Sequence, residues 1–593
     1  MLPPDDRVVL LDQLRPPMGY RLDAAVATTF TLDLAAALVP PVAFASFEMR
    51  GTPDPVAALE AVRSCADRVD IFCQAGNIRI PAQASDLMAY LEPMVHEVRR
   101  PRPGYLFHPK VWFLRYSSPD LPGQFRLLCS TRNLTNDRSW DAVVRLDGSR
   151  STGLMPENRP LSDFLARLPD LCVTPLDDTR RGRIASLASD ARYIEWEHPD
   201  NVREIKFHAL GLGRTTARPD FTGYRHLVVS PFCNDDGLAT VAPSWGDVSL
   251  VSRPEAIDRL APESLEGVTT YRLDPLAGLA DPDDEAAAGT GSELLTGLHA
   301  KIVVVERNRA AHVFIGSANA TSSAHTGNVE FVVELTGGAS KIGVDAFMAA
   351  DAPFRQLLEP YATTGGMPPD TADAESRALE NLLRDVAVRQ FTLTVDGGDG
   401  GYLLMLASTT PLEFPTAITL CAELMTRPGH SETLVTGTRA LAAFTDVPLA
   451  DITPFVAVRA STASGLTRGT VLRASLVNDP AGRLDEILAR QVDTPEKFLR
   501  FLALLLGLAD PASLLPAETG RTGGTAFFGG GTTGILELIL RALADHPQAL
   551  HDLDRLVERL HVTAAGTEVL PQGFTPLWVT VMSALQRAES ETP

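Results

Sequence analysis

Apolar runs alternate with helical apolar spacing along the first two thirds of the chain. In residues 1–200, PVAALEAVRSCA (from Pro55) has the period of an amphipathic helix. Runs rich in β-branched and aromatic residues predict the strands around it: Val42–Glu48, Val69–Ala75, Lys110–Tyr116 and Phe125–Ser130. Strands interleaved with helices are typical of an α/β fold.

The same alternation returns between residues 201 and 365. EAIDRLA predicts a short helix, and the expected strands are HLVVSPF, VSLVS, KIVVVER, HVFIGS and EFVVEL. Matching landmarks in the two segments, His108 and His299, are 191 positions apart. That period is too long for a solenoid repeat and indicates a duplicated domain. We therefore expect two α/β domains, 1–200 and 201–365, each with a mixed sheet flanked by helices.

The last third of the chain has a different pattern. GGMPPDTADAES indicates a linker, which we place at 366–384. Short alternating runs separated by turn residues then predict a β-rich accessory domain over 385–480. Amphipathic spacing from Thr494 onward predicts a helical C-terminal domain over 481–593.

Composition limits the function. The 593 residues carry 53 basic and 74 acidic side chains, a net charge of −21, which argues against coating nucleic acid by bulk charge. Residues 1–200 carry 23 basic and 26 acidic side chains, so a phosphate-binding face is easiest to place there.

Six scattered cysteines without a C-x2-C pair predict reduced core thiols and no zinc site. The acids and prolines of MLPPDDRVVLLDQLRPP are unlike a secretion signal. The longest apolar run, FLALLLGLA, is too short to span a bilayer. These features predict a cytoplasmic protein with no stable membrane association.

A duplicated motif carries the candidate chemistry. The chain has five lysines, and two of them stand in H-x-K triplets, His108-Pro109-Lys110 and His299-Ala300-Lys301. Each triplet is followed by a small polar corner at the end of the next predicted strand, Ser130-Thr131-Arg132-Asn133 or Gly316-Ser317-Ala318-Asn319. Chance rarely repeats such a constellation.

Strand geometry gives the repeated motif a chemical meaning. Residues i and i+2 of a strand face the same side, so His and Lys of each triplet project together. Ammonium, amide and hydroxyl groups are the donors that phosphate oxygens accept. Imidazole can attack phosphorus or donate a proton near neutral pH. Two facing copies would put one imidazole on each side of a phosphodiester.

This pattern resembles the phospholipase D superfamily over about residues 20–365. The resemblance implies two lobes that share one active site, a covalent phosphohistidine intermediate, and no metal or other cofactor. It implies that His108 and His299 are the nucleophile and acid, with His108 favoured as nucleophile. The resemblance also implies two groups of residues that bind the phosphate. The catalytic partners would be Lys110, Lys301, Asn133 and Asn319, and the substrate-binding residues would be Ser130, Thr131, Arg132 and Ser317.

In that superfamily a carboxylate beyond the Asn corner often holds a catalytic His, and Asp141 and Glu330 stand in those positions. The sequence also departs from the full motif H-x-K-x4-D, because Arg115 and Glu306 replace the final Asp. Such losses occur in nuclease-like branches, and STRNLTNDRSWD resembles their first lobe. Arg132 within the corner also favours a nucleic-acid substrate.

The resemblance therefore predicts a metal-independent nuclease that acts on DNA in preference to RNA. A bacterial defence or restriction system would be its setting, with a helicase or another defence-system protein as partner. Two alternatives stay open. One is a lipid phosphodiesterase or phosphatidyl transferase, and the other is a non-catalytic scaffold of a nucleic-acid-processing complex.

Overall fold

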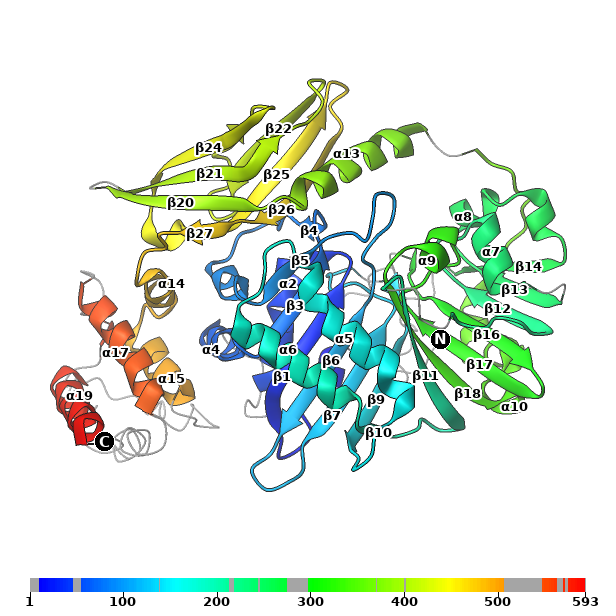
Figure 1. Cartoon of the computed structure of the whole chain (residues 1–593), viewed down its shortest axis with the longest axis horizontal. Coiled ribbons are helices and arrows are strands. Elements are labelled where there is room, and N and C mark those ends of the chain that lie inside the picture. Colours follow the sequence, from blue (N-terminus) through cyan, green and yellow to red (C-terminus); the bar gives the residue numbers. More distant parts are fainter. Residues whose placement is uncertain are drawn as a thin grey trace, which may run out of the picture.

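The computed structural model describes residues 10–591, apart from 46–54, 138, 213–217, 244–245, 275–296, 369–370, 399–400, 506–546, 563–568 and 571–573. It has an α/β fold, with several sheets and flanking helices (Figure 1). Within these residues, no helix combines the length and apolar character that a membrane crossing requires.

The first sheet forms one α/β unit, with helices α5 (Arg159–Leu171) and α6 (Asp178–Ala191) over one face (Figure 1). Strands β1, β3 and β5 are parallel, whereas β6, β7 and β9 are antiparallel to their neighbours. The order across the sheet is β10 (Ile194–Trp196), β9 (Val143–Arg150), β7 (Gln124–Ser130), β6 (Val111–Ser117), β1 (Arg21–Thr29), β3 (Val69–Gln74), β5 (Val95–Val98).

The second sheet repeats this arrangement in a second α/β unit. Its parallel strands β12, β13 and β14 match β1, β3 and β5, and the hairpin β16–β17 matches β6–β7. The order is β11 (Val202–Leu210), β18 (Glu330–Gly338), β17 (Ala310–Gly316), β16 (Ile302–Arg307), β12 (Arg225–Val229), β13 (Asp247–Val251), β14 (Val268–Leu273), β19 (Leu358–Pro360). The two sheets therefore share a similar strand order.

One hydrophobic core crosses the boundary between the two units. Phe164 of α5 packs on Phe331 of β18 with ring centroids 4.9 Å apart, and Phe207 of β11 continues the cluster. Because both sheets bury side chains in this core, the two units are fixed relative to one another.

In the first unit one predicted strand was wrong, and one strand was missed. Val42–Glu48 was expected to be a strand, but helix α3 occupies Val39–Ala45. Prolines 40 and 41 fall in its first turn, where a missing N–H costs little. Strand β1 was not anticipated, since LDAAVATT contains four residues of low β propensity, yet it is buried in the centre of the sheet.

Beyond the second unit lies a β-rich module of two four-stranded sheets that share one core. The first sheet has the order β24 (Thr438–Val447), β21 (Gly401–Leu412), β20 (Phe391–Gly398), β27 (Ser475–Val477). The second has the order β23 (Glu432–Thr433), β22 (Ile418–Leu424), β25 (Phe455–Thr462), β26 (Thr467–Arg473). Helices α14 (Arg483–Gln491), α15 (Pro495–Leu505), α17 (Pro547–Val562) and α19 (Phe574–Glu591) follow and share the core of the first unit.

The segment predicted as a linker, 366–384, is mostly helical. Helix α13 spans Thr371–Ala387 and leads into the β-rich module (Figure 1). Its buried residues Leu379, Leu383 and Val386 recur every three or four positions, so they cover one face of the helix. The glycines and prolines before residue 371 favoured the prediction of a linker, so the amphipathic pattern that follows them was not recognised as a helix.

Helix α13 packs directly on the first unit at Gly76, just after β3. A Cβ at Gly76 would lie 2.7 Å from the Cα of Arg384, and Gly76 has a φ of +79°. Arg384 Nε donates a 2.9 Å hydrogen bond to the side-chain oxygen of Asn77. Its guanidinium also lies 5.8 Å from the ring of Phe30. The backbone at Gly76 therefore contacts the backbone of α13 directly, and there is no room for a side chain between them.

We expect Gly76→Ala to lower the free energy of unfolding more than Gly19→Ala does. Both glycines have positive φ, but a Cβ at Gly19 would meet nothing within 4 Å, so Gly19→Ala reports the cost of φ alone. The clash with α13 should add about 1–3 kcal/mol. Urea denaturation of the two variants measures the difference, and equal midpoints would contradict this packing.

Candidate active site between the two α/β units

The two H-x-K triplets lie immediately before strands β6 and β16, at the N-terminal end of each strand. Lys110 and Lys301 are 2% and 3% exposed. In each triplet the lysine Nζ donates to the carbonyl of its own histidine, at 2.9 Å to His108 and 2.7 Å to His299. The two triplets therefore repeat one local geometry as well as one sequence pattern.

His108 of the first unit is held by residues of the second. Its backbone N–H donates to the Val329 carbonyl at 2.8 Å, and its Nδ1 lies 2.8 Å from Oε2 of Glu330. Glu330 is fully buried and accepts further hydrogen bonds from Ser317 Oγ and Asn328 Nδ2. Because a carboxylate accepts, Nδ1 carries the proton and Nε2 keeps its lone pair.

His299 of the second unit is held by residues of the first. Its backbone N–H donates to the Trp140 carbonyl at 2.8 Å, and Nδ1 donates to the Thr131 carbonyl at 2.9 Å. Strand β8 (Ser139–Trp140) pairs in parallel with β15 (Gly297–Leu298) beside it. Each histidine is thus positioned by the opposite unit, and the site is complete only when the two units are assembled.

The two expected carboxylates occupy equivalent places but have different partners. Thr131 N donates to Ala142 O and Ser317 N donates to Phe331 O, so Asp141 and Glu330 precede matching residues. Glu330 reaches His108, whereas Asp141 lies 3.7 Å from Nε of Arg132. Asp141 was expected to hold a histidine. In the structure the Thr131 carbonyl makes that contact with His299 instead.

Arg132 is engaged within its own corner. Its Nη2 donates to the Thr135 carbonyl at 2.8 Å and to the Asp137 carbonyl. Ser130 Oγ accepts from Arg132 N at 3.0 Å, and Thr131 Oγ1 bonds Ala142. These groups, expected to contact substrate, are used in this structure to shape the loop that carries Asn133.

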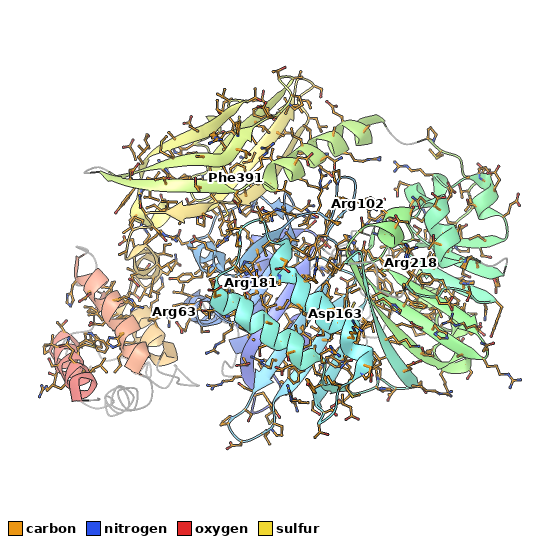
Figure 2. All side chains as sticks on the ribbon, viewed as in Figure 1. Arg63, Arg102, Asp163, Arg181, Arg218 and Phe391 are labelled. Carbon is orange, nitrogen blue, oxygen red and sulfur yellow. The ribbon has the colours of Figure 1, made fainter. Side chains whose placement is uncertain are left out.

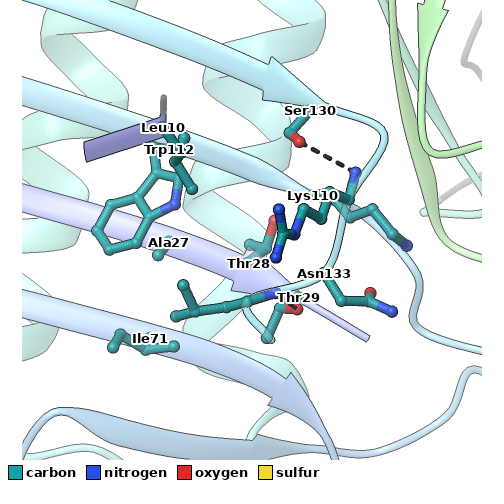
Figure 3. Close-up of a pocket in the computed structure, with 11 residues that line it drawn as sticks. Leu10, Ala27, Thr28, Thr29, Ile71, Lys110, Trp112, Ser130 and Asn133 are labelled. Atoms are coloured by element: carbon teal, nitrogen blue, oxygen red, sulfur yellow. Dashed lines mark hydrogen bonds between the residues drawn. The ribbon is translucent and has the colours of Figure 1, made fainter. Parts of the chain in front are cut away.

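The asparagines supply polar groups without partners. The side-chain oxygens of Asn133 and Asn319 are both buried, and neither has a hydrogen-bond partner among the described residues. A pocket opens next to Asn133, and Figure 3 shows its amide and the Lys110 side chain projecting in the same direction past the strand ends. An amide oxygen is an acceptor, so only the NH2 group of each asparagine could donate to an anion, as the ammonium of a lysine can.

Charge interactions tie the four motif side chains into one cluster. Burial lowers the pKa of His108 to about 4, although Glu330 acts to raise it. Burial and the neighbouring Lys301 and Lys110 lower the pKa of His299 to about 2. Burial lowers the pKa of Lys110 to about 7, and burial with Lys110 holds the pKa of Lys301 well below its usual range. Both imidazoles are therefore neutral at pH 7.

The two carboxylates differ in ionisation as well as in position. Burial acts to raise the pKa of Glu330, but His108 and Lys110 bring it below its ordinary value. Burial raises the pKa of Asp141, and Arg132 only partly opposes this effect. Glu330 is thus the firmly ionised member of the pair.

The residues that replace the final motif Asp are structural. Arg115 forms hydrogen bonds with Asp23 and Asp190 on the outside of the first unit. Glu306 accepts a 2.8 Å bond from Val344 N and lies 4.0 Å from Arg225. Both side chains hold neighbouring elements together away from the histidines.

Sequence reasoning missed three contributors to the site. Phe30, at the end of β1, packs edge-on against His108 with centroids 5.2 Å apart. Trp140 contributes its carbonyl to His299, and Arg253 donates to the Leu298 carbonyl at 2.9 Å. A backbone carbonyl or a packing ring leaves no recognisable sequence motif, so these three contributors could be identified only from the folded structure.

No group of three or more His, Cys, Asp or Glu side chains suited to a metal ion occurs in the part of the chain that the structure describes. The potential phosphate donors are the lysine and asparagine groups described above.

Comparisons with known proteins gave one kind of match. No protein-family model matches the chain, and no curated protein matches it. Among solved structures, the chain is similar to a mutant of yeast tyrosyl-DNA phosphodiesterase, with 12% sequence identity and a TM-score of 0.34. That match covers 59% of this chain and 92% of the yeast protein.

Proposed function

We propose that this chain is a phosphodiesterase of the phospholipase D type that cleaves nucleic acid, with DNA favoured over RNA. The observation that carries the proposal is that each α/β unit supplies the hydrogen-bond partner of the other unit's histidine. Glu330 of the second unit holds His108, the Thr131 carbonyl of the first unit holds His299, and the two lysines lie close enough to depress the pKa of Lys301. Two imidazoles and two lysine amines on one buried site suit in-line displacement at a phosphodiester.

His108 is the nucleophile in this proposal. Its Nδ1–H points at Glu330, so Nε2 attacks phosphorus with its lone pair and the bond to the leaving oxygen breaks. The new N–P bond makes the ring cationic, and the ionised Glu330 stabilises that charge. Water then attacks phosphorus, the N–P bond breaks, and His108 returns to its neutral form.

His299 is the proton donor and acceptor. Its Nδ1 contacts a carbonyl rather than a carboxylate, and burial and the neighbouring lysines lower its pKa, so its imidazolium is poorly stabilised and is a strong acid. A bound phosphate brings a negative charge that raises the pKa of His299 and favours its protonation. His299 then protonates the leaving oxygen in the first step and takes the proton of the attacking water in the second.

The remaining groups bind the phosphate. The charge of a bound phosphate raises the pKa values of Lys110 and Lys301, so both are protonated beside it and neutralise its non-bridging oxygens, and Asn133 and Asn319 donate amide hydrogens to them. Thr131 and Ser317 keep the corners and Glu330 in place. A defence or restriction system with a helicase partner is the setting that the family resemblance suggests.

Arginines near the site favour nucleic acid as substrate. Arg102 of the first unit stacks on Tyr105, which packs on Gly327 of the second unit, and the charge of Arg218 acts on the pKa of His325 (Figure 2). Arg253 lies against the strand that leads into His299. In a chain with a net charge of −21, such local cations suit binding to a few phosphates.

The substrate class can be tested with plasmid, single-stranded DNA, RNA and phospholipid vesicles, each with and without EDTA. We expect DNA to be cleaved and cleavage to survive EDTA, since lysines and imidazoles supply the charges. Loss of cleavage in EDTA would contradict the mechanism. Cleavage of vesicle lipid alone would identify a lipid phosphodiesterase, and no turnover of any substrate would favour a scaffold.

A further inference from the structure

A large aromatic side chain lies exposed beside the proposed site. Phe232 follows strand β12 and is 49% exposed, although Ser230, two positions before it, is buried. Aromatic rings are costly to leave in water, and one at the entrance of a buried polar site suggests a ligand surface.

The loop that carries Phe232 is fastened to the second Asn corner. Ser230 Oγ donates to the Phe232 carbonyl at 2.7 Å and accepts from Ala320 N at 3.0 Å. Asn234 N donates to the Ala320 carbonyl at 3.1 Å. Ala320 is the residue after Asn319, so the Phe232 ring has a defined position relative to a proposed phosphate-binding amide.

Arg253 connects the same ring to the histidine strand. Its guanidinium lies 5.0 Å from the centroid of Phe232, while its Nε and Nη2 donate to the Leu298 carbonyl at 3.1 and 2.9 Å. Leu298 directly precedes His299, and the charge of Arg253 acts on the pKa of Lys301. The Phe232 ring and the Arg253 guanidinium therefore form one fixed surface at the edge of the site.

We propose that Phe232, backed by Arg253, stacks a base next to the scissile phosphate, so that the substrate is single-stranded or locally unpaired. This inference rests on the proposed function and specifies its substrate class. A base within a duplex is stacked on both faces, whereas an unpaired base can lay one face on an aromatic ring. Arg253 fixes the ring and adds positive charge beside the backbone phosphate.

Binding and cleavage of labelled oligonucleotides test the inference. We expect the wild-type protein to bind a single-stranded oligothymidine more tightly than the same strand in a duplex, by fluorescence anisotropy. Stacking energies of about 1–3 kcal/mol per base correspond to a roughly 5- to 150-fold weaker Kd in Phe232→Ala. Phe232→Trp should restore binding. Tyr224→Ala is the matched control, because Tyr224 is exposed but lies at the opposite end of β12.

An abasic strand separates this inference from the proposed function. It has phosphodiesters but no bases, so Phe232→Ala should bind and cleave it like the wild type. Equal Kd values for Phe232→Ala and Tyr224→Ala on oligothymidine would overturn the inference, as would tighter wild-type binding to duplex. The binding measurement needs no turnover, and absence of cleavage in the wild type would count against the proposed function alone.

Discussion

Replacing His108 with alanine should reduce cleavage by roughly 10⁴–10⁶-fold, because the substitution removes the imidazole that the proposal makes the nucleophile. Quenched reactions of the wild type should contain a protein-linked phosphate that is labile in acid, as a phosphohistidine is. The His108→Ala protein should not form this adduct. His198→Ala is the matched control, since His198 is an exposed histidine of the same unit.

His299→Ala should also lose turnover but fail at a different step. Without the acid, the first displacement slows, and without the base, water cannot resolve the adduct. With a substrate that has a good leaving group, we therefore expect the phosphorylated protein to accumulate in His299→Ala. An adduct that forms in His108→Ala and never in His299→Ala would reverse the two assignments. Cleavage unchanged in both variants would remove the mechanism altogether.

The parts of the site that the sequence predicted are those encoded over a few residues. An H-x-K triplet needs only the two-residue period of a strand, and the Asn corner needs only a tight turn at a strand end. Because the motif occurs twice in the chain, a chance match was an unlikely explanation for it. The α/β fold followed from apolar runs of the same kind, and failed at Val39–Ala45, where adjacent prolines start a helix.

What the sequence could not predict depends on the assembly of the two units. Glu330 was identified as a carboxylate that holds a histidine, but its partner is His108, 222 positions away in the other unit. No local sequence pattern predicts which of the two units supplies the hydrogen-bond partner of a given histidine. Glu330 contacts a histidine whereas Asp141 pairs with Arg132, and this contrast becomes visible only when both histidines are in place.

That contrast leads to the second large effect. Glu330→Gln should slow formation of the phosphohistidine by roughly 10²–10⁴-fold, because the amide neither carries the charge that stabilises the cationic ring nor fixes the Nδ1–H tautomer. Asp141→Asn should change the rate far less, since Asp141 pairs with Arg132 and contacts neither histidine in this structure. Rapid-quench measurement of the adduct at saturating substrate compares the two variants.

The pH dependence distinguishes electrostatic support from mere packing. His108 attacks as neutral imidazole, so the rate of adduct formation falls when pH drops through the pKa of His108. Glu330 raises that pKa, and its removal must lower it. The acid limb of Glu330→Gln should therefore move to lower pH while the plateau rate falls. A lower plateau with an unmoved acid limb would mean that Glu330 only packs the site. A limb moved to higher pH would contradict the assignment of His108 as the neutral nucleophile.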